Sequence, residues 1–301
     1  MTEEHFNKYI SSRGILKQSH IHMPNPTSSI TRLINYDFSK CTNGSTVYIC
    51  TSALRDFIQN YFPKITKKII LITGDCDETC WIDIFETHEF FLNFINDNRI
   101  VQWFSQNCTA SHPKLTSIPI GMDYHTMTNH HKVWGPQLNP FQQEMILETF
   151  VSNSKPFCER QCKAYSNFHF AMNTKYGYDR KDALHKIDPN LVYYEPHHAL
   201  RETSWSKQIT YSFVISPLGN GLDCHRTWEA LILGCIPIVK VSPLDILYED
   251  LPVLIVNSWS DITQSLLDNT ILNFKTKTFK YEKLTSKYWF NLINSKSKDY
   301  F

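Results

Sequence analysis

Short apolar runs rich in β-branched residues alternate with segments of helical periodicity from residue 46 onward. This alternation predicts parallel strands joined by crossover helices, because a parallel strand is buried on both faces and its connection must be long. In the first half of the chain the predicted strands are 46–50, 68–73, 100–104 and 118–120. A helix is predicted over 53–61, where Pro63 ends it, and another around 91–95.

A second alternation of the same kind fills the other half of the chain. Its predicted strands are 168–172, 191–194, 211–216, 236–241 and 253–256. Its predicted helices are 180–187, 199–209 and 223–233. Two such series, each the size of a nucleotide-binding fold, predict an α/β protein of two Rossmann-like, doubly wound domains that face each other across a cleft.

The domain boundary is expected late in the stretch 121–160, where Gly and Pro residues interrupt the alternation. We therefore expect an acceptor-side domain over 1–153, a second domain over 154–280, and a helical tail over 281–301 that packs back on the body. A length of 301 residues agrees with two domains of ordinary size.

Charge and hydropathy exclude several classes of protein. Lys plus Arg total 30 against 29 Asp plus Glu, a formal net charge of +1, which argues against a histone-like binder of nucleic acid. The longest uncharged apolar stretch, 230–239, is ten residues long and contains Gly234 and Pro237. It is too short to span a bilayer, so no transmembrane segment or secretory leader is predicted.

The cysteines indicate a reduced compartment, because their number is nine and no CxxC pair occurs. Cys76 with Cys80 and Cys158 with Cys162 are spaced CxxxC, and no matching His pair accompanies them. We therefore expect buried thiols, no metal site and a cytoplasmic protein.

The segment 216–239, SPLGNGLDCHRTWEALILGCIPIV, is the most informative part of the chain. It is predicted to form a strand, a glycine loop, a helix, a glycine stop and a strand. Gly219 and Gly221 allow a tight turn, and the helix that opens near Asp223 points its unpaired N–H groups at the loop. An anion such as a nucleoside diphosphate fits there, with His225 and Arg226 as cationic partners.

Two alternatives to this anion-binding interpretation remain open, a dinucleotide fingerprint and a surface ion pair. Gly219-x-Gly221 begins the dinucleotide fingerprint of an oxidoreductase or epimerase, but Cys224 stands where the third glycine is required. His225 and Glu229 are four residues apart on one helical face, so the carboxylate can accept hydrogen bonds from a ribose diol. The alternative is a simple Arg226–Glu229 ion pair on a solvated face.

This run, followed by LPVLIVNSW at 251–259, resembles the carboxyl-terminal nucleotide-sugar domain of exostosin-type glycosyltransferases, in the compact form found in soluble viral and bacterial enzymes. In the first half only WFSQN at 103–107 and IPIGMDYHT at 118–126 are similar. The resemblance implies a GT-B fold without a catalytic metal or other cofactor, a nucleotide sugar on the second domain and a glycan acceptor on the first. It assigns Glu229 to the donor ribose and Arg226 and Arg180 to the diphosphate. The full set of donor-binding residues expected is Arg180, Ser216, Gly219, Asn220, Gly221, Asp223, His225, Arg226 and Glu229.

Transfer to a hydroxyl also requires a base, and loops that follow strands of the first domain offer carboxylates. Asp75 and Asp77 come directly after KIILIT, and Asp123 with His125 follows IPIG. Each of these aspartates can instead cap a helix or hold a turn. The sequence thus predicts an inverting, metal-independent glycosyltransferase that uses a UDP-sugar such as UDP-xylose, UDP-glucuronic acid or UDP-N-acetylglucosamine. A nucleotide-dependent oxidoreductase or epimerase and a catalytically silent nucleotide-sugar-binding protein are the alternatives.

Overall fold

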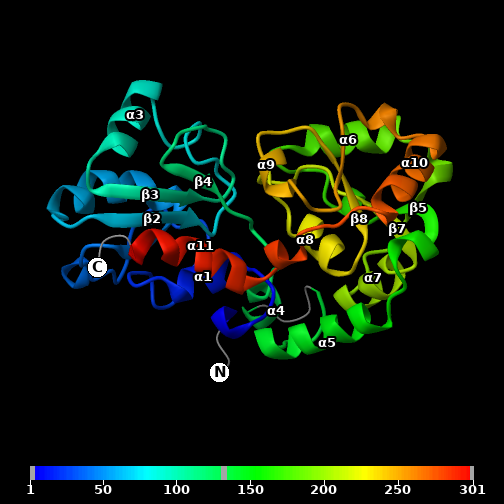
Figure 1. Cartoon of the computed structure of the whole chain (residues 1–301), viewed down its shortest axis with the longest axis horizontal. Coiled ribbons are helices and arrows are strands. Elements are labelled where there is room, and N and C mark those ends of the chain that lie inside the picture. The colour runs from blue at the N-terminus through cyan, green and yellow to red at the C-terminus, as the bar shows by residue number, and fades with distance from the viewer. Residues whose placement is uncertain (1–3, 130–133, 299–301) are drawn as a thin grey trace. The chain divides into compact units, whose positions relative to one another are not determined.

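In the computed structural model the chain is described over residues 4–129 and 134–298, and it forms two parallel sheets of 4 and 5 strands (Figure 1). The chain divides into two compact units. We call residues 3–120 with 285–301 the terminal unit, and residues 121–284 the central unit. The division at residue 120 lies earlier than the boundary expected after residue 153. The reason is that α5 (Pro140–Asn153) packs against α7 (Arg201–Gln208), within the central unit.

The sheet of the terminal unit contains four parallel strands in the order in which they occur along the chain. They are β1 (Ser45–Cys50), β2 (Ile69–Gly74), β3 (Ile100–Ser105) and β4 (Leu115–Ser117). The first three confirm the prediction. The fourth was expected at 118–120, but its ladder ends at Ser117 because the partner strand β3 ends opposite it at Ser105.

One face of this sheet is covered by the segments that connect consecutive strands, as right-handed crossovers in a single direction require. α2 (Leu54–Asp56) continues through η4 (Phe57–Tyr61) and η5 (Phe62–Lys64), close to the predicted helix 53–61. α3 (His88–Asn96) is capped by Thr87 and buries Phe91, Phe94 and Ile95.

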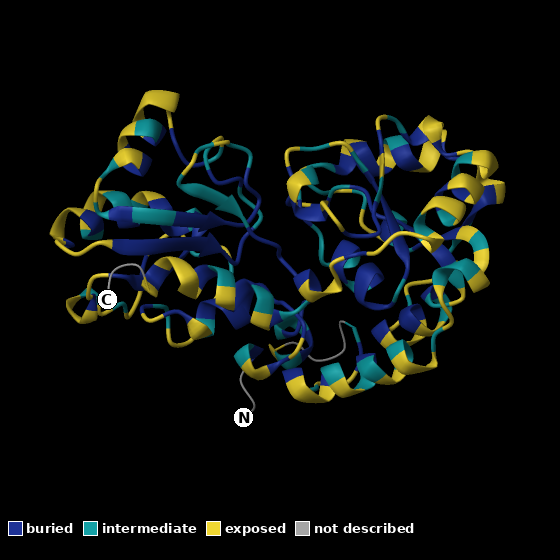
Figure 2. Cartoon of the chain, viewed as in Figure 1, coloured by how far each residue is buried: buried dark blue, intermediate teal, exposed yellow. Residues whose placement is uncertain are grey.

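The other face of the sheet is covered by helices from both ends of the chain. α1 (Ser12–Gln18) packs against α11 (Ser286–Lys298), and α11 packs on β2 and β3. α11 buries Trp289, Phe290 and Ile293, and the Ser286 hydroxyl donates to the Tyr9 carbonyl at 2.9 Å. Figure 2 shows buried and exposed stretches alternating along this helix. From Ser286 to Lys298 the expected tail packs on the terminal unit, whereas η10 (Tyr281–Leu284) belongs to the central unit. The remaining short helices of the unit are η1 (Glu4–Phe6), η2 (Phe38–Lys40) and η3 (Thr51–Ala53).

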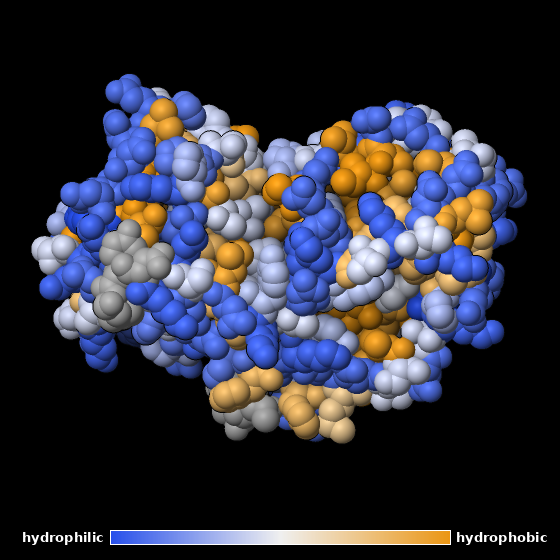
Figure 3. Space-filling view, in the orientation of Figure 1, coloured by the Kyte–Doolittle hydropathy of each residue, from blue (hydrophilic) through white to orange (hydrophobic). Residues whose placement is uncertain are grey.

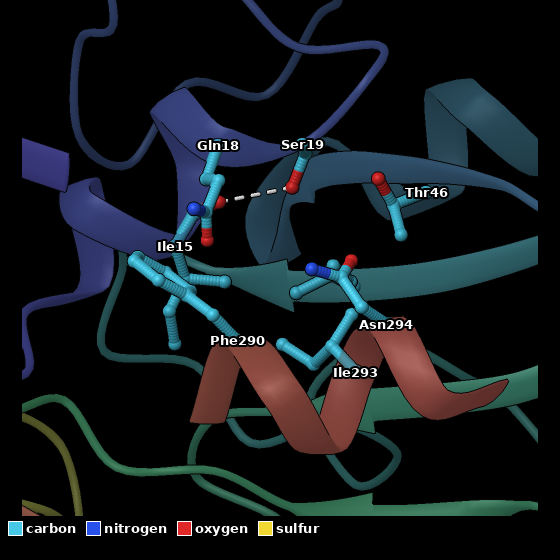
Figure 4. A pocket seen from close by; sticks show the side chains of 8 residues that line it. Ile15, Gln18, Ser19, Thr46, Phe290, Ile293 and Asn294 are labelled. Carbon is cyan, nitrogen blue, oxygen red and sulfur yellow. Dashed lines mark hydrogen bonds between the residues drawn. The ribbon is translucent and has the colours of Figure 1, made fainter. Parts of the chain in front are cut away.

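A pocket lies where α1, α11 and β2 meet (Figure 4). Ile15, Gln18, Phe290 and Asn294 contribute to its wall, and the Ser19 hydroxyl donates to the Ile15 carbonyl at 3.0 Å. The space inside is that of about one water molecule. This space is too small for a sugar or a nucleotide.

The sheet of the central unit has its strands in the order β6-β5-β7-β8-β9, all parallel. The strands are β5 (Gln161–Ser166), β6 (Val192–Tyr194), β7 (Tyr211–Ile215), β8 (Ile236–Lys240) and β9 (Leu254–Val256). Numbered within the unit this is the order 2-1-3-4-5, in which the winding reverses between β5 and β7. The reversal puts helices on both faces of the sheet.

α6 (Gly177–Lys186) and α10 (Gln264–Lys275) cover one face, and α7 and α8 (His225–Ile232) cover the other (Figure 1). The other helical segments are α4 (His125–Asn129), α9 (Asp245–Tyr248), η6 (Phe157–Glu159), η8 (Pro189–Leu191), η9 (Trp259–Asp261) and η10 (Tyr281–Leu284). The helices predicted in this half are confirmed to within a few residues.

The strand predicted at 168–172 is wrong. Those residues form η7 (Phe168–Phe170) and a loop, and the strand is β5 at 161–166. Its exposed first half contains Gln161 and Lys163, and its buried half is Ala164, Tyr165 and Ser166, so it lacks the branched apolar residues by which the other strands are recognised.

Polar residues cover most of the face drawn in Figure 3, where apolar residues form separate patches. Exposed large apolar side chains of this kind, such as Leu272 and Ile255, occur on most folded domains. No helix among the described residues has both the length and the apolar character that crossing a membrane requires.

Candidate functional site

The strand order of the central unit locates its ligand site. Ligands of open parallel sheets bind beyond the carboxyl ends of the strands, at the point where the winding reverses. Here that point lies between β5 and β7, whose neighbouring residues Tyr165 and Val214 are in register. The loops that leave these two strands, 167–176 and 216–224, therefore form the candidate site.

Gly219 is a point of contact between the two loops. Its carbonyl accepts from Tyr176 N–H at 3.0 Å, and a Cβ at this position would lie 3.0 Å from Arg180 Nη2 and 3.1 Å from Cys224 Sγ. Arg180 lies in α6 and its Nε donates to the Leu218 carbonyl at 2.9 Å. The absence of a side chain at residue 219 thus lets the glycine loop lie directly against a guanidinium group.

Arg226 supplies a second guanidinium group to the same site. Its Nε donates to Asn167 Oδ1 at 3.2 Å and its Nη1 lies 3.5 Å from the Pro217 carbonyl oxygen, so it spans the ends of β5 and β7. Burial and the nearby charge of Arg226 lower the pKa of Arg180. Neither arginine forms an ion pair with a carboxylate of residues 4–129 or 134–298. Two neighbouring cations without a counter-ion are a site for an anion.

Four residues of the predicted donor set form hydrogen bonds within the two loops and the start of α8. Asp223 is buried and accepts from the Trp228 indole N–H at 2.8 Å and from Cys224 N–H at 2.9 Å. The Ser216 hydroxyl bonds to Thr227 at 2.8 Å. Asn220 Oδ1 accepts from Lys175 N–H at 3.3 Å, and the Gly221 carbonyl accepts from Gly219 N–H at 3.1 Å. These residues shape the loop and fix the start of α8, which begins at His225, two residues after Asp223.

Glu229 lies one helical turn beyond His225, as predicted, but it is not paired with Arg226. Its Oε1 lies 3.0 Å from Arg201 Nη2, and its Oε2 accepts from the Trp205 indole N–H at 3.3 Å. The side chain keeps 17% of its accessible surface. Because a carboxylate has about four lone-pair sites, Glu229 retains capacity to accept hydrogen bonds from a ligand.

Asp123 also belongs to the central unit. Its Oδ1 lies 3.2 Å from His125 Nδ1 and accepts from Thr126 N–H at 2.9 Å. Burial opposes ionisation, but His225, His125 and Arg201 outweigh it and lower the pKa of Asp123. A carboxylate with a lowered pKa is a poor proton acceptor, so the structure favours Asp123 as a partner of the histidines rather than as the base.

Asp75 and Asp77 belong to the terminal unit, whereas the other predicted site residues belong to the central unit. Asp75 Oδ1 accepts from Arg13 Nε at 3.3 Å and from the Ser28 hydroxyl at 2.9 Å, and its backbone has a φ of 55°. Asp75 therefore forms an ion pair with Arg13, and these contacts hold it in place at the end of β2. Asp77 is half-buried.

Sequence reasoning missed two residues that organise the site. Asn167, which holds Arg226, follows the strand that was placed at the wrong position. Arg201 Nη1 donates to the Asp123 carbonyl at 2.7 Å and to Gln143 Oε1 at 3.1 Å, and its other nitrogen binds Glu229. The only sequence signal for Asn167 was its position directly after a strand, and the only signal for Arg201 was its position in the first turn of a helix.

Polar atoms at the carboxyl edge of β5 and β6 have no hydrogen-bond partner among the described residues, although they are shielded from solvent. They are Ser166 Oγ, His169 Nδ1, Thr174 Oγ1 and Tyr194 Oη. Buried polar groups are nearly always bonded, so these atoms are available to a ligand bound at this edge.

No group of three or more His, Cys, Asp or Glu side chains within the described ranges is placed to hold a metal ion. The nine cysteines are free thiols. Among them Cys80 and Cys108 are close, with 3.8 Å between their sulfur atoms.

The sequence was compared with models of protein families and with curated proteins, and neither comparison found a match. The resemblance to exostosin-type glycosyltransferases therefore remains a prediction from the segment 216–239 and its neighbourhood.

Proposed function

We propose that the protein is a metal-independent, inverting glycosyltransferase of the GT-B type. It transfers a sugar from a nucleoside diphosphate sugar, with UDP as the expected nucleotide, to a hydroxyl of a glycan. The central unit binds the donor. The proposal places the enzyme in the cytoplasm, in line with its free cysteines.

The observation that carries the proposal is the convergence of Arg180 and Arg226 on the Gly219 loop at the reversal between β5 and β7. A diphosphate placed there meets both guanidinium groups and the N-terminus of α8. Fixed cations and helix N–H groups stabilise the negative charge that develops on a departing nucleoside diphosphate, which is the role a metal ion has in other transferases.

Glu229 supports a nucleotide rather than a bare phosphate. It lies one turn farther along α8 than Arg226 and is held in place by Arg201 and Trp205. A ribose attached to the diphosphate can donate its hydroxyl hydrogens to the carboxylate oxygens. The unpartnered atoms of Ser166, His169 and Tyr194 offer further contacts beyond the end of the sheet.

The test is incubation of the protein with a panel of UDP-sugars and glycan acceptors, with mass spectrometry of the products and calorimetry of UDP binding. A new glycoside is expected. Arg226→Gln and Arg180→Gln should each weaken UDP binding by about 1.5–3 kcal/mol, the value of a charge-assisted hydrogen bond. Lys186→Gln is the matched control, because this cation on α6 is paired with Asp182 at 2.9 Å and should leave the affinity unchanged.

Other outcomes would contradict the proposal in distinct ways. Binding of NAD without binding of UDP would indicate an oxidoreductase or epimerase. Binding of a UDP-sugar without formation of a glycoside or hydrolysis of the donor would indicate a silent binding protein.

A further inference from the structure

Two histidines of the central unit lie near the buried carboxylate of Asp123. His125 lies on the same loop, with its Nδ1 3.2 Å from Asp123 Oδ1. His225 opens α8, and the two imidazole ring centres are 6.3 Å apart. Arg201 donates to the Asp123 carbonyl and binds Glu229, so it joins this loop to α8.

The contact of His225 with Gly121 fixes the position of its ring proton. His225 Nδ1 lies 2.7 Å from the Gly121 carbonyl oxygen. A carbonyl only accepts hydrogen bonds, so Nδ1 carries the hydrogen and Nε2 of the neutral ring carries a lone pair. No residue within 4–129 or 134–298 bonds to that Nε2, and the side chain is partly exposed to solvent.

We propose that His225 is the general base of the transferase, that it accepts the proton of the attacking hydroxyl at Nε2, and that Asp123 and His125 are positioning residues for it. This inference rests on the proposed function. It replaces the three aspartates as candidates for the base and gives His225 a different role from the phosphate ligand expected from the sequence.

The step balances as follows. The acceptor O–H bond breaks and its proton goes to Nε2 of His225, while the acceptor oxygen forms a bond to the anomeric carbon of the sugar. The bond from that carbon to the diphosphate oxygen breaks, and its electron pair leaves with the nucleoside diphosphate beside Arg226 and Arg180. The imidazolium then returns its proton to the solvent.

The charges around His225 suit this role. Arg226 and Glu229 lie on its own helix. The elements packed against that helix add charged or titratable groups, namely Asp123, His125, Arg201, Lys240, Tyr248, Tyr281, Glu282 and Lys283. Burial raises the pKa of Asp123, but the positive charges near it, that of His225 first among them, lower this pKa further than burial raises it. An ionised carboxylate beside the ring stabilises the imidazolium that forms when the proton is taken up.

The experiment compares wild type, His225→Gln and His185→Gln. His185 is an exposed histidine in the last turn of α6, outside the site, and serves as the control. His225→Gln is expected to lower kcat by about 10²–10⁴-fold. Its dissociation constant for UDP should remain within about threefold of the wild-type value. The wild-type profile of kcat/KM should fall on the acid side as the base becomes protonated, and that fall should be lost in the residual activity of His225→Gln.

A second readout does not need turnover. Long-range ¹H–¹⁵N spectra of the wild-type protein, assigned by the signals lost in His225→Gln, should show His225 with its hydrogen on Nδ1. A full-rate His225→Gln enzyme, or a hydrogen on Nε2, would overturn the inference while leaving the transferase proposal intact. A wild-type protein that neither transfers sugar nor hydrolyses any donor would overturn the transferase proposal itself.

Discussion

At the scale of single residues, Gly177 and Gly219 show two different reasons for a glycine in the central unit. A Cβ on Gly177 would overlap the backbone carbonyl oxygen of Met172, which has no freedom to move aside. A Cβ on Gly219 would meet the ends of two side chains, Arg180 Nη2 at 3.0 Å and Cys224 Sγ at 3.1 Å. Gly177 is therefore required by the packing of the backbone, whereas Gly219 leaves room for the guanidinium group of Arg180.

This difference predicts that one alanine variant loses stability and that the other loses affinity for UDP. Gly177→Ala should lower the free energy of unfolding by about 2 kcal/mol, because backbone must shift. Gly219→Ala should change it by less than about 1 kcal/mol but should displace Arg180 and weaken UDP binding roughly tenfold. Urea unfolding and calorimetry measure the two effects. Equal losses of stability in both variants would show that residue 219 is only a packing position.

At the scale of elements, the predictions succeeded where turn chemistry and apolar content agreed. β7, α8 and β8 lie within two residues of their predicted bounds, because a branched apolar run ends at a glycine loop and Gly234, with a φ of 72°, ends the helix. β5 was missed because its buried half contains small and polar residues at the edge of the site. Asn167 was missed with it, and no spacing rule assigns Arg201 to Glu229 across two helices.

α11 supplies a prediction at this scale. Trp289 is 4% exposed on the face of the helix that covers the terminal sheet. Trp289→Ala should cost about 3–5 kcal/mol of unfolding free energy, since a large aromatic leaves a cavity. Lys287→Ala, an exposed change on the same helix, should cost less than about 0.5 kcal/mol. Urea unfolding of both variants measures these two free-energy changes. Similar midpoints would mean that α11 adds little to the stability of the unit.

At the scale of the whole molecule, two parallel sheets were predictable and the division of the chain was not. The Gly and Pro residues that interrupt the alternation spread over 121–160 and do not mark the boundary at residue 120. The segment 121–129 joins the central unit through Arg201 and His225. The predicted double winding applies to the central sheet. The second face of the terminal sheet is closed by α1 and α11 rather than by crossover helices, which periodicity alone does not reveal.

The division into units predicts which backbone amides a bound nucleotide protects from hydrogen exchange. Saturating UDP, at about 100 times its dissociation constant, should stabilise the protein by about 2.7 kcal/mol. Hydrogen exchange measured by mass spectrometry should slow in the loops 167–176 and 216–224 of the central unit. Slowing confined to the loop around Asp75, in the terminal unit, would contradict the assignment of the donor site.

The placement of α11 also has a consequence for synthesis on the ribosome. All of the central unit is translated before α11, so it can fold while the nascent chain is still attached, whereas the terminal sheet keeps an apolar face uncovered until α11 emerges. The terminal unit thus closes after the central unit although its synthesis begins earlier, and during that interval its open apolar face is prone to aggregation.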